Sequence, residues 1–281
     1  MELTREFVEH EYNNRARVPD HPKWLARFTE WSATARQQLA PKLDLRYGPG
    51  AKETLDLFLP AGPARGTLAF IHGGYWRALD KNDFSFVATP FVAQGYAVAV
   101  VNYDLCPQVT VATIVDECKR AILWLVREGA QHGANPSQLV VSGHSAGGHL
   151  AAMMLTIDWR AEGLPHDPIA ASVSLSGVHD LAPITLFSFN SDIRLDLAEA
   201  RRLSPVNLKA RTATPLLIAA GADETSEFRR QSQILWDAWP ANRPRGESAP
   251  MFVPARDHFT VVLDYAEADS ALTQKTLALF P

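Results

Sequence analysis

The feature that most constrains the fold is the stretch 138–155, which reads QLVVSGHSAGGHLAAMML. The apolar run 139–141 is followed by the pentapeptide GHSAG at 143–147 and then by a segment rich in Ala, Leu and Met. This order predicts a strand, a sharp turn and a helix, the context in which a G-x-S-x-G pentapeptide holds a serine hydroxyl above a sheet. Ser145 is therefore the candidate nucleophile, and an ordinary strand-to-helix turn is the alternative.

Apolar runs and helical segments alternate along most of the chain. Such repeated units, with continuous apolar strands, indicate an α/β fold with a mostly parallel central sheet and helices on both faces. In such sheets functional sites lie at the carboxyl ends of the strands. We expect strands over 67–71, 96–103, 139–141, 171–175 and 216–220, an edge hairpin over 43–47 and 54–59, and helices over 83–94 and 115–127; a short apolar run at 251–253 follows.

The 281 residues are expected to form a single domain, 1–281, because the chain is long enough for one large α/β core. Residues 1–42 mix charges, aromatic residues and prolines, which suggests one or two short helices on the surface. Between the last two long apolar runs lies a proline-punctuated segment, and we expect a small cap over the site within 179–210.

The composition, 47% hydrophobic and 21% charged with a net charge of -4, gives no reason to expect nucleic acid or an acidic membrane as partner. Cys106 and Cys118 lie in no metal-ligand or redox spacing, so we expect both to be reduced. The N-terminus is charged from its second residue and lacks the apolar core of a signal peptide. These features favour a cytoplasmic protein that acts on a small molecule.

A serine nucleophile needs a base, and that base needs a carboxylate to hold its tautomer. In α/β-hydrolases the chain order is serine, acid, histidine. Of the nine histidines, His166, His179 and His258 follow the segment 138–155 that holds Ser145. The first two precede the completion of the last parallel strands, so His258 is the predicted base.

The acid is expected in a loop at the carboxyl end of a strand that precedes His258. Asp223 is the predicted acid because it follows the apolar run 216–220 directly. Glu224 is its close rival, and Asp180, after the preceding strand, is a further alternative. Asp257 stands next to His258 and is expected to cap the chain locally.

Acyl transfer also needs N–H donors for the oxyanion of the tetrahedral intermediate. The residue after the nucleophile, Ala146, should supply one. The others should come from the loop after the first buried strand, where Gly73, Gly74 and Tyr75 follow His72. We interpret His72 as a residue that fixes this loop, and the two histidines near the nucleophile, at 144 and 149, as structural.

Five blocks resemble the kynurenine formamidase (arylformamidase) family of α/β-hydrolases, of the HGG-x-W type. They are HGGYW at 72–76, GHSAGGHLAAMML at 143–155, SGVHDLAPI at 176–184, GADETSEFRRQS at 221–232 and RDHF at 256–259. Carried over by position, the resemblance implies the same catalytic residues, Ser145, Asp223 and His258. It also implies hydrolysis of N-formyl-L-kynurenine to formate and L-kynurenine in tryptophan breakdown, without metal or organic cofactor.

A formyl group is small and its leaving group here is a large aromatic amine. Trp76, Phe187 and Phe189 are candidates for the leaving-group side of the site, and packing in the core is the alternative for each. The competing function is that of a carboxylesterase or amidase acting on small aromatic esters, which would use the same catalytic residues. A binding protein of this fold usually lacks a member of the triad, and none is missing here.

Overall fold

The computed structural model describes residues 3–280, and its centre is an eight-stranded sheet. In chain order the strands are β1 Lys42–Arg46, β2 Thr54–Phe58, β3 Thr67–Ile71, β4 Ala97–Val101, β5 Leu139–His144, β6 Ile169–Leu175, β7 Leu216–Gly221 and β8 Met251–Val253. Across the sheet their order is β1-β2-β4-β3-β5-β6-β7-β8. Only β2 runs antiparallel to its neighbours, β1 and β4, among the described pairings, so the expected mostly parallel sheet is confirmed.

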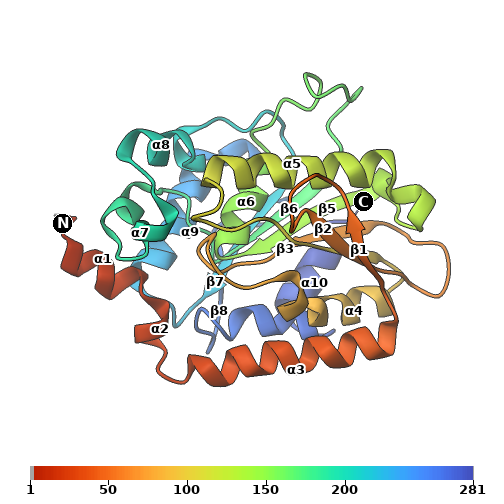
Figure 1. Cartoon of the computed structure of the whole chain (residues 1–281), viewed down its shortest axis with the longest axis horizontal. Helices are drawn as coiled ribbons and strands as arrows, with labels where there is room; N and C mark the ends of the chain where they lie inside the picture. The colour runs from red at the N-terminus through yellow and green to blue at the C-terminus, as the bar shows by residue number, and fades with distance from the viewer. Residues whose placement is uncertain (1–2, 281) are drawn as a thin grey trace.

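Helices cover both faces of the sheet, as the alternation of strand and helix predicts (Figure 1). Helices α5 and α6 lie on one face, and α3, α4 and α10 lie on the other. The helices are α1 Arg5–Tyr12, α2 Asn14–Arg17, α3 His21–Leu39, α4 Ala88–Ala93, α5 Val111–Arg127, α6 Ala146–Met154, α7 Asn190–Ile193, α8 Leu197–Arg202, α9 Ser226–Ala238 and α10 Ala271–Leu277.

The sheet separates two apolar cores because side chains alternate between the faces of a strand. In β3, Leu68 and Phe70 pack with residues of α3, α4 and α10, whereas Ala69 and Ile71 pack with those of α5 and α6. All four side chains are buried. Because β3 and β5 to β8 are parallel, their carboxyl ends reach the same edge of the sheet, and the loops that follow them meet there.

Residues 1–42, where one or two short helices were expected, hold three helices, and α3 is 19 residues long. Two helices further along the chain also differ from the sequence prediction. The expected helix over 83–94 is wrong in its first half, where two short 3-10 turns precede α4, and Pro90 falls in the first turn of α4, where no N–H is needed. Helix α5 begins four residues earlier than expected, at Val111, because Thr110 caps it by accepting a hydrogen bond from the Thr113 N–H at 3.1 Å.

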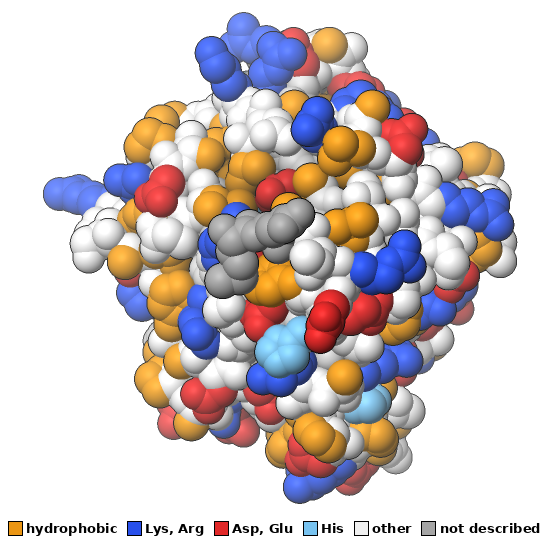
Figure 2. Space-filling view, turned by 90° about the vertical axis from the view of Figure 1, so that its left-hand side faces the viewer, with side chains coloured by type: hydrophobic (Ala, Val, Ile, Leu, Met, Phe, Trp, Pro, Cys, Tyr) orange, Lys and Arg blue, Asp and Glu red, His pale blue; other side chains and the backbone are white. Residues whose placement is uncertain are grey.

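Residues 179–210, the expected cap, contain α7 and α8 with short 3-10 turns on either side. On the face of the molecule near α1, acidic and basic side chains are interspersed (Figure 2). Within residues 3–280, no helix combines the length and the apolar character needed to cross a lipid bilayer.

Candidate active site

Ser145 stands between β5 and α6 in a strained backbone conformation, with φ 57° and ψ -119°. A non-glycine residue rarely adopts a positive φ, so the surrounding turn must hold it there. Its N–H donates to the Leu175 carbonyl at 2.8 Å, and the side chain is 3% exposed. The sequence prediction of a strand, a sharp turn and a helix around this serine is confirmed.

The two glycines of the pentapeptide are required by close backbone contacts. A Cβ at Gly143 would lie 2.1 Å from the Gly147 carbonyl oxygen, and a Cβ at Gly147 would lie 2.0 Å from the Ile71 carbonyl oxygen. Both distances are far shorter than any carbon–oxygen contact, so a side chain at either position would force the turn open. The turn therefore packs directly against the end of β3, which leads into the second loop of the site.

His258 lies in the loop after β8, and its Nε2 is 3.0 Å from the Ser145 Oγ. Two neighbours also contact His258, one through its ring and one through its backbone. The Phe228 ring lies 4.5 Å from it, and His144 Nε2 donates to the His258 carbonyl at 2.9 Å. Burial, together with the neighbouring His258, lowers the pKa of His144 well below its usual range, so His144 stays neutral and acts as a fixed donor.

The carboxylate beside this histidine is Glu224, not Asp223. Glu224 Oε2 lies 2.7 Å from His258 Nδ1, while its Oε1 accepts from the Gly221 N–H at 2.7 Å and from Ser176 Oγ at 2.5 Å. Asp223 is exposed, and its N–H donates to the Arg256 carbonyl. The prediction of Asp223 as the group that orients the histidine is wrong.

The reason is the turn that follows β7. The Glu224 N–H donates to the Gly221 carbonyl at 3.3 Å, and this turn directs the side chain at 223 outward and the next one inward. Both residues follow the same strand, so their place in the chain does not separate them. The two other carboxylates that the sequence offered are used locally: Asp180 accepts from the Ala182 N–H and Asp257 from the Thr260 N–H.

The loop after β3 lies against the nucleophile. A Cβ at Gly73 would be 3.0 Å from the Ser145 Cβ, so glycine leaves the space in front of the serine open. His72 is buried, and the Tyr103 ring stacks on its imidazole with the ring centres 4.2 Å apart. The Tyr103 hydroxyl donates a hydrogen bond to the His72 carbonyl at 2.9 Å. Burial lowers the pKa of His72 to about 4. His72 is thus a neutral residue that fixes the loop, as interpreted from the sequence.

The same loop turns through three successive positive φ values, at Gly74 (110°), Tyr75 (49°) and Trp76 (56°). A Cβ at Gly74 would lie 2.0 Å from the Ala78 carbonyl oxygen, so this position requires glycine. Within residues 3–280, the N–H groups of Gly74, Tyr75 and Ala146 donate to no protein acceptor. These free N–H groups, on the loops next to Ser145, are the donors that an oxyanion hole needs.

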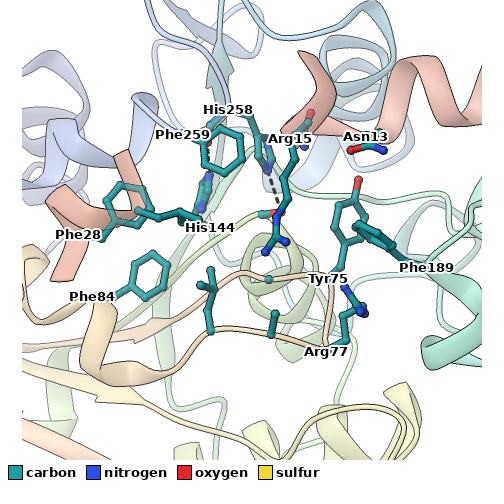
Figure 3. Close-up of a pocket in the computed structure, with 16 residues that line it drawn as sticks. Asn13, Arg15, Phe28, Tyr75, Arg77, Phe84, His144, Phe189, His258 and Phe259 are labelled. Atoms are coloured by element: carbon teal, nitrogen blue, oxygen red, sulfur yellow. Dashed lines mark hydrogen bonds between the residues drawn. The ribbon is translucent and has the colours of Figure 1, made fainter. Parts of the chain in front are cut away.

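A pocket opens above Ser145 and His258, and its walls are mainly aromatic and aliphatic (Figure 3). Of the described residues that line it, none is Asp or Glu. The other lining residues come from the N-terminal segment 1–42, the loop after β3, the end of β5, the cap segment and the loop after β8. They are Asn13, Asn14, Arg15, Leu25, Phe28, Gly74, Tyr75, Arg77, Ala78, Leu79, Phe84, His144, Phe189 and Phe259.

Of the three aromatic residues expected to contact substrate, Phe189 lines the pocket and the other two do not. Trp76 is fully buried and packs edge-on against His149 at 5.1 Å. Phe187 is 2% exposed and lies behind Tyr75 and Phe189, at 5.2 and 4.7 Å. The predictions for Trp76 and Phe187 are therefore wrong, since both belong to the core that supports the pocket wall.

The N-terminal segment, expected to be a surface element without a chemical role, joins two loops of the site. Tyr75 Oη donates to the Tyr12 carbonyl at 2.6 Å, and Thr225 Oγ1 donates to the Glu11 carbonyl at 2.8 Å. Tyr12 Oη in turn donates to Glu227 Oε2 at 2.7 Å. Burial and the nearby Glu227 raise the pKa of Tyr12, so its hydroxyl remains a donor. No sequence pattern in the segment signals these long-range contacts.

Three histidines that the sequence set aside make no hydrogen bond to the Ser145 hydroxyl within residues 3–280. His149 is buried, and its Nε2 donates to the Leu203 carbonyl at 2.8 Å. His179 is buried beside Ser174, 3.2 Å from its hydroxyl, and His166 is exposed. Burial lowers the pKa of His149 to about 4 and that of His179 to about 3, so both are neutral structural residues.

Comparisons with known proteins point to one family. A family model described as BD-FAE matches residues 55–239. Kynurenine formamidase of Salmo salar is 29% identical over 99% of this chain and 95% of the relative, and that of Danio rerio is 30% identical over 92% and 87%. The chain belongs to the BD-FAE family and to the kynurenine formamidase branch of the α/β-hydrolases.

Solved structures share the same fold. A candidate thioesterase from Silicibacter sp. has a TM-score of 0.81 at 31% identity and covers 94% of this chain and 96% of that one. Esterase B from Lactobacillus rhamnosis has the same fold as this chain, with a TM-score of 0.65. It is 20% identical, and the match covers 95% of this chain and 93% of that one.

The match to the BD-FAE family model includes Ser145 and Glu224 but ends before His258. It also begins after α1, α2 and α3. The similarity to the Salmo salar member of the kynurenine formamidase branch covers nearly all of the chain. The elements that close the pocket therefore lie within the part of the chain shared with this branch of the family.

Proposed function

We propose that the chain hydrolyses the formamide of N-formyl-L-kynurenine, or of a similar N-formyl arylamine, to formate and the free aryl amine. The observation that carries this proposal is the line of hydrogen bonds from Glu224 through His258 to Ser145, which opens into an aromatic pocket that no described Asp or Glu lines. Its support from relatives is the similarity to proteins named kynurenine formamidase over almost the whole chain.

The first half of the reaction forms a formyl-enzyme. His258 Nε2 takes the Ser145 proton, and Oγ attacks the formyl carbon to give a tetrahedral intermediate. The oxyanion accepts hydrogen bonds from the N–H groups of Gly74, Tyr75 and Ala146. The imidazolium then gives its proton to the aryl nitrogen as the carbon–nitrogen bond breaks, and the free amine leaves.

The second half returns the enzyme to its starting state. A water molecule gives a proton to His258 and attacks the formyl-serine ester, and the imidazolium then protonates Ser145 Oγ as formic acid departs, which loses its proton to solvent and becomes formate. Throughout, the Glu224 carboxylate accepts the Nδ1–H of His258 at 2.7 Å, which leaves Nε2 facing the serine and stabilises the imidazolium. Because the Gly221 N–H and the Ser176 hydroxyl both donate to the other carboxylate oxygen, the Glu224 side chain is held in the orientation that faces His258.

A substrate comparison tests the proposal. Purified enzyme is assayed with N-formyl-L-kynurenine and with p-nitrophenyl acetate, before and after treatment with a serine-directed organophosphate. We expect the larger kcat/KM for the formamide, and loss of both activities once Ser145 is phosphorylated. Turnover of the ester without turnover of N-formyl-L-kynurenine would overturn the proposal.

The second candidate function is a carboxylesterase or amidase that acts on small aromatic esters. It is favoured by the similarity at 31% identity to a candidate thioesterase, since the same serine, histidine and carboxylate can cleave an ester. In the assay above, a kcat/KM for aryl esters that exceeds the value for the formamide identifies this alternative.

We place the reaction in the cytoplasm as part of the same proposal. Its support is that Cys106 and Cys118 are both buried and unpaired, as is usual in a reducing compartment. Cell fractionation tests the placement, and recovery of the protein outside the cytoplasmic fraction would contradict it.

A further inference from the structure

The pocket above Ser145 contains one cation without a counter-ion. Among the described lining residues, Arg15 and Arg77 are the only side chains of the Lys, Arg, Asp and Glu types. Arg77 is already neutralised, because its Nε and a terminal nitrogen contact the Asp192 carboxylate at 2.7 and 2.5 Å. Its guanidinium also stacks over Phe189 at 4.5 Å. Arg15, by contrast, has no ion-pair or hydrogen-bond partner within residues 3–280.

The Arg15 side chain extends from α2 toward the hydrogen bond between His258 and Ser145 (Figure 3). Beside it, Asn14 lines the same pocket and is 5% exposed. The Asn14 Nδ2 is buried and has no hydrogen-bond partner among the described residues. A buried donor without a partner is costly, so this amide is suited to an acceptor that arrives with a ligand.

Arg15 and the Asn14 amide lie on α2, and hydrogen bonds fix this part of the chain at several points. Asn13 caps α2 by accepting from the Ala16 N–H at 3.2 Å. One residue earlier, the Tyr12 carbonyl accepts a hydrogen bond from the Tyr75 hydroxyl, and the Tyr12 hydroxyl donates one to Glu227. The donors are therefore held in place relative to the oxyanion loop, and little ordering is needed when a ligand binds.

We infer that Arg15, together with the amide of Asn14, binds a carboxylate on the leaving group and so selects aromatic amino-acid substrates. The inference rests on the proposed function, because the amine released from N-formyl-L-kynurenine carries an amino-acid side chain. That side chain is ortho to the formamide on the ring, which keeps its carboxylate near the reacting carbon and within reach of the pocket that Arg15 lines. A guanidinium matches a carboxylate in charge and in geometry.

The test uses two matched pairs of substrates. N-formyl-L-kynurenine is compared with 2′-formamidoacetophenone, which keeps the ring and ketone but lacks the amino acid. The ester 3-(2-acetoxyphenyl)propanoate is compared with phenyl acetate in the same way. The variants are R15Q and R15K, with R17Q as the matched control, since Arg17 lies on the same helix but does not line the pocket above Ser145 and contacts His10 at 3.0 Å.

For R15Q we expect kcat/KM to fall about 10- to 100-fold, mainly through KM, for the two substrates that carry a carboxylate, as for a lost charge-assisted hydrogen bond. The two neutral substrates should change by less than about twofold, and R15K should recover part of the loss. R17Q should behave as the parent on all four. The preference for carboxylate should also weaken as salt is raised, because Arg15 is exposed.

The outcomes separate this inference from the proposed function. An equal loss on charged and neutral substrates, or no loss in R15Q, overturns the role of Arg15 and leaves formamide hydrolysis intact. A parent enzyme that cleaves only the esters, yet prefers the carboxylate ester through Arg15, contradicts the formamidase proposal and supports the anion site. An enzyme that cleaves none of the four contradicts both.

Discussion

Two regions form the active site, and they differ in how they are held. Ser145, Glu224 and His258 stand on loops at the carboxyl ends of β5, β7 and β8, where parallel pairing of buried strands fixes their spacing. The N-terminal segment α1–α2 pairs with no strand and is held by side-chain hydrogen bonds to the loops at 75 and 225. The first region holds the reacting groups, and the second closes the pocket in which a leaving group must fit.

The comparison teaches that chemistry and selectivity can be separated along the chain. A nucleophile and its base need sub-ångström positioning, which a sheet supplies. A pocket wall can come from any segment that packs over the site, even one more than 100 residues away. Changes in the strand-end loops should therefore affect every substrate, whereas changes in α1–α2 should discriminate between leaving groups.

The largest effect is expected for Ser145→Ala. Removal of the nucleophile should lower kcat by about 10⁴- to 10⁶-fold for formamides and esters alike. Because the side chain is small, the urea midpoint should stay close to that of the parent, which circular dichroism measures. A variant as active as the parent would show that the strand-end loops do not carry the chemistry at all.

The next effect distinguishes the two adjacent carboxylates. Glu224→Gln should lower kcat by about 10³- to 10⁴-fold, because an amide no longer holds the His258 tautomer or stabilises its cation. Asp223→Asn, the matched control, should retain activity within about twofold, since Asp223 is exposed and does not contact the histidine. Steady-state kinetics with one formamide and one ester provide the measurement. The reverse pattern would restore Asp223 as the acid.

A smaller effect tests the link between the regions. Tyr75→Phe removes the hydroxyl that donates to the Tyr12 carbonyl, and we expect about 1–2 kcal/mol less stability. The kcat/KM should fall by about 3- to 10-fold, as for a change of roughly 1 kcal/mol in transition-state binding, because the oxyanion loop loses a contact. The control is Tyr96→Phe, whose hydroxyl has no hydrogen-bond partner among the described residues. Equal behaviour of the two variants in urea unfolding and kinetics would show that α1 does not support the loop.

The smallest effect on activity is expected outside both regions, at Glu117 on α5. Burial raises the pKa of Glu117 from 4.5 to about 7. The native state therefore keeps a proton that the unfolded chain has lost, and stability falls as pH rises from about 4.5 to about 7. Glu117→Gln should be about 1–3 kcal/mol more stable than the parent at pH 8 and equal to it near pH 4, with unchanged kcat/KM.

Urea unfolding at the two pH values measures this difference. A stability gain of the same size at both would mean that titration of Glu117 is not its cause. A change in kcat/KM would mean that the site is sensitive to a helix on the outer face of the sheet, which would weaken the distinction between the two regions.

The sequence by itself determined the parallel sheet, the elbow and the pair of Ser145 with His258. These follow from local patterns and chain order, because apolar runs, glycine spacing and the order of strands are properties of short segments. The edge hairpin was also predictable, whereas the first half of the expected helix before β4 was not, because 3-10 turns have no distinct apolar period.

Only the tertiary structure decided which carboxylate reaches His258, because Asp223 and Glu224 follow the same strand and differ in the direction of one turn. It also decided that Trp76 and Phe187 are buried behind the pocket. Above all it brought Asn14 and Arg15 over Ser145. No periodicity or spacing encodes a contact across 130 residues, since it depends on how α1 packs against two loops that form only when the sheet is complete.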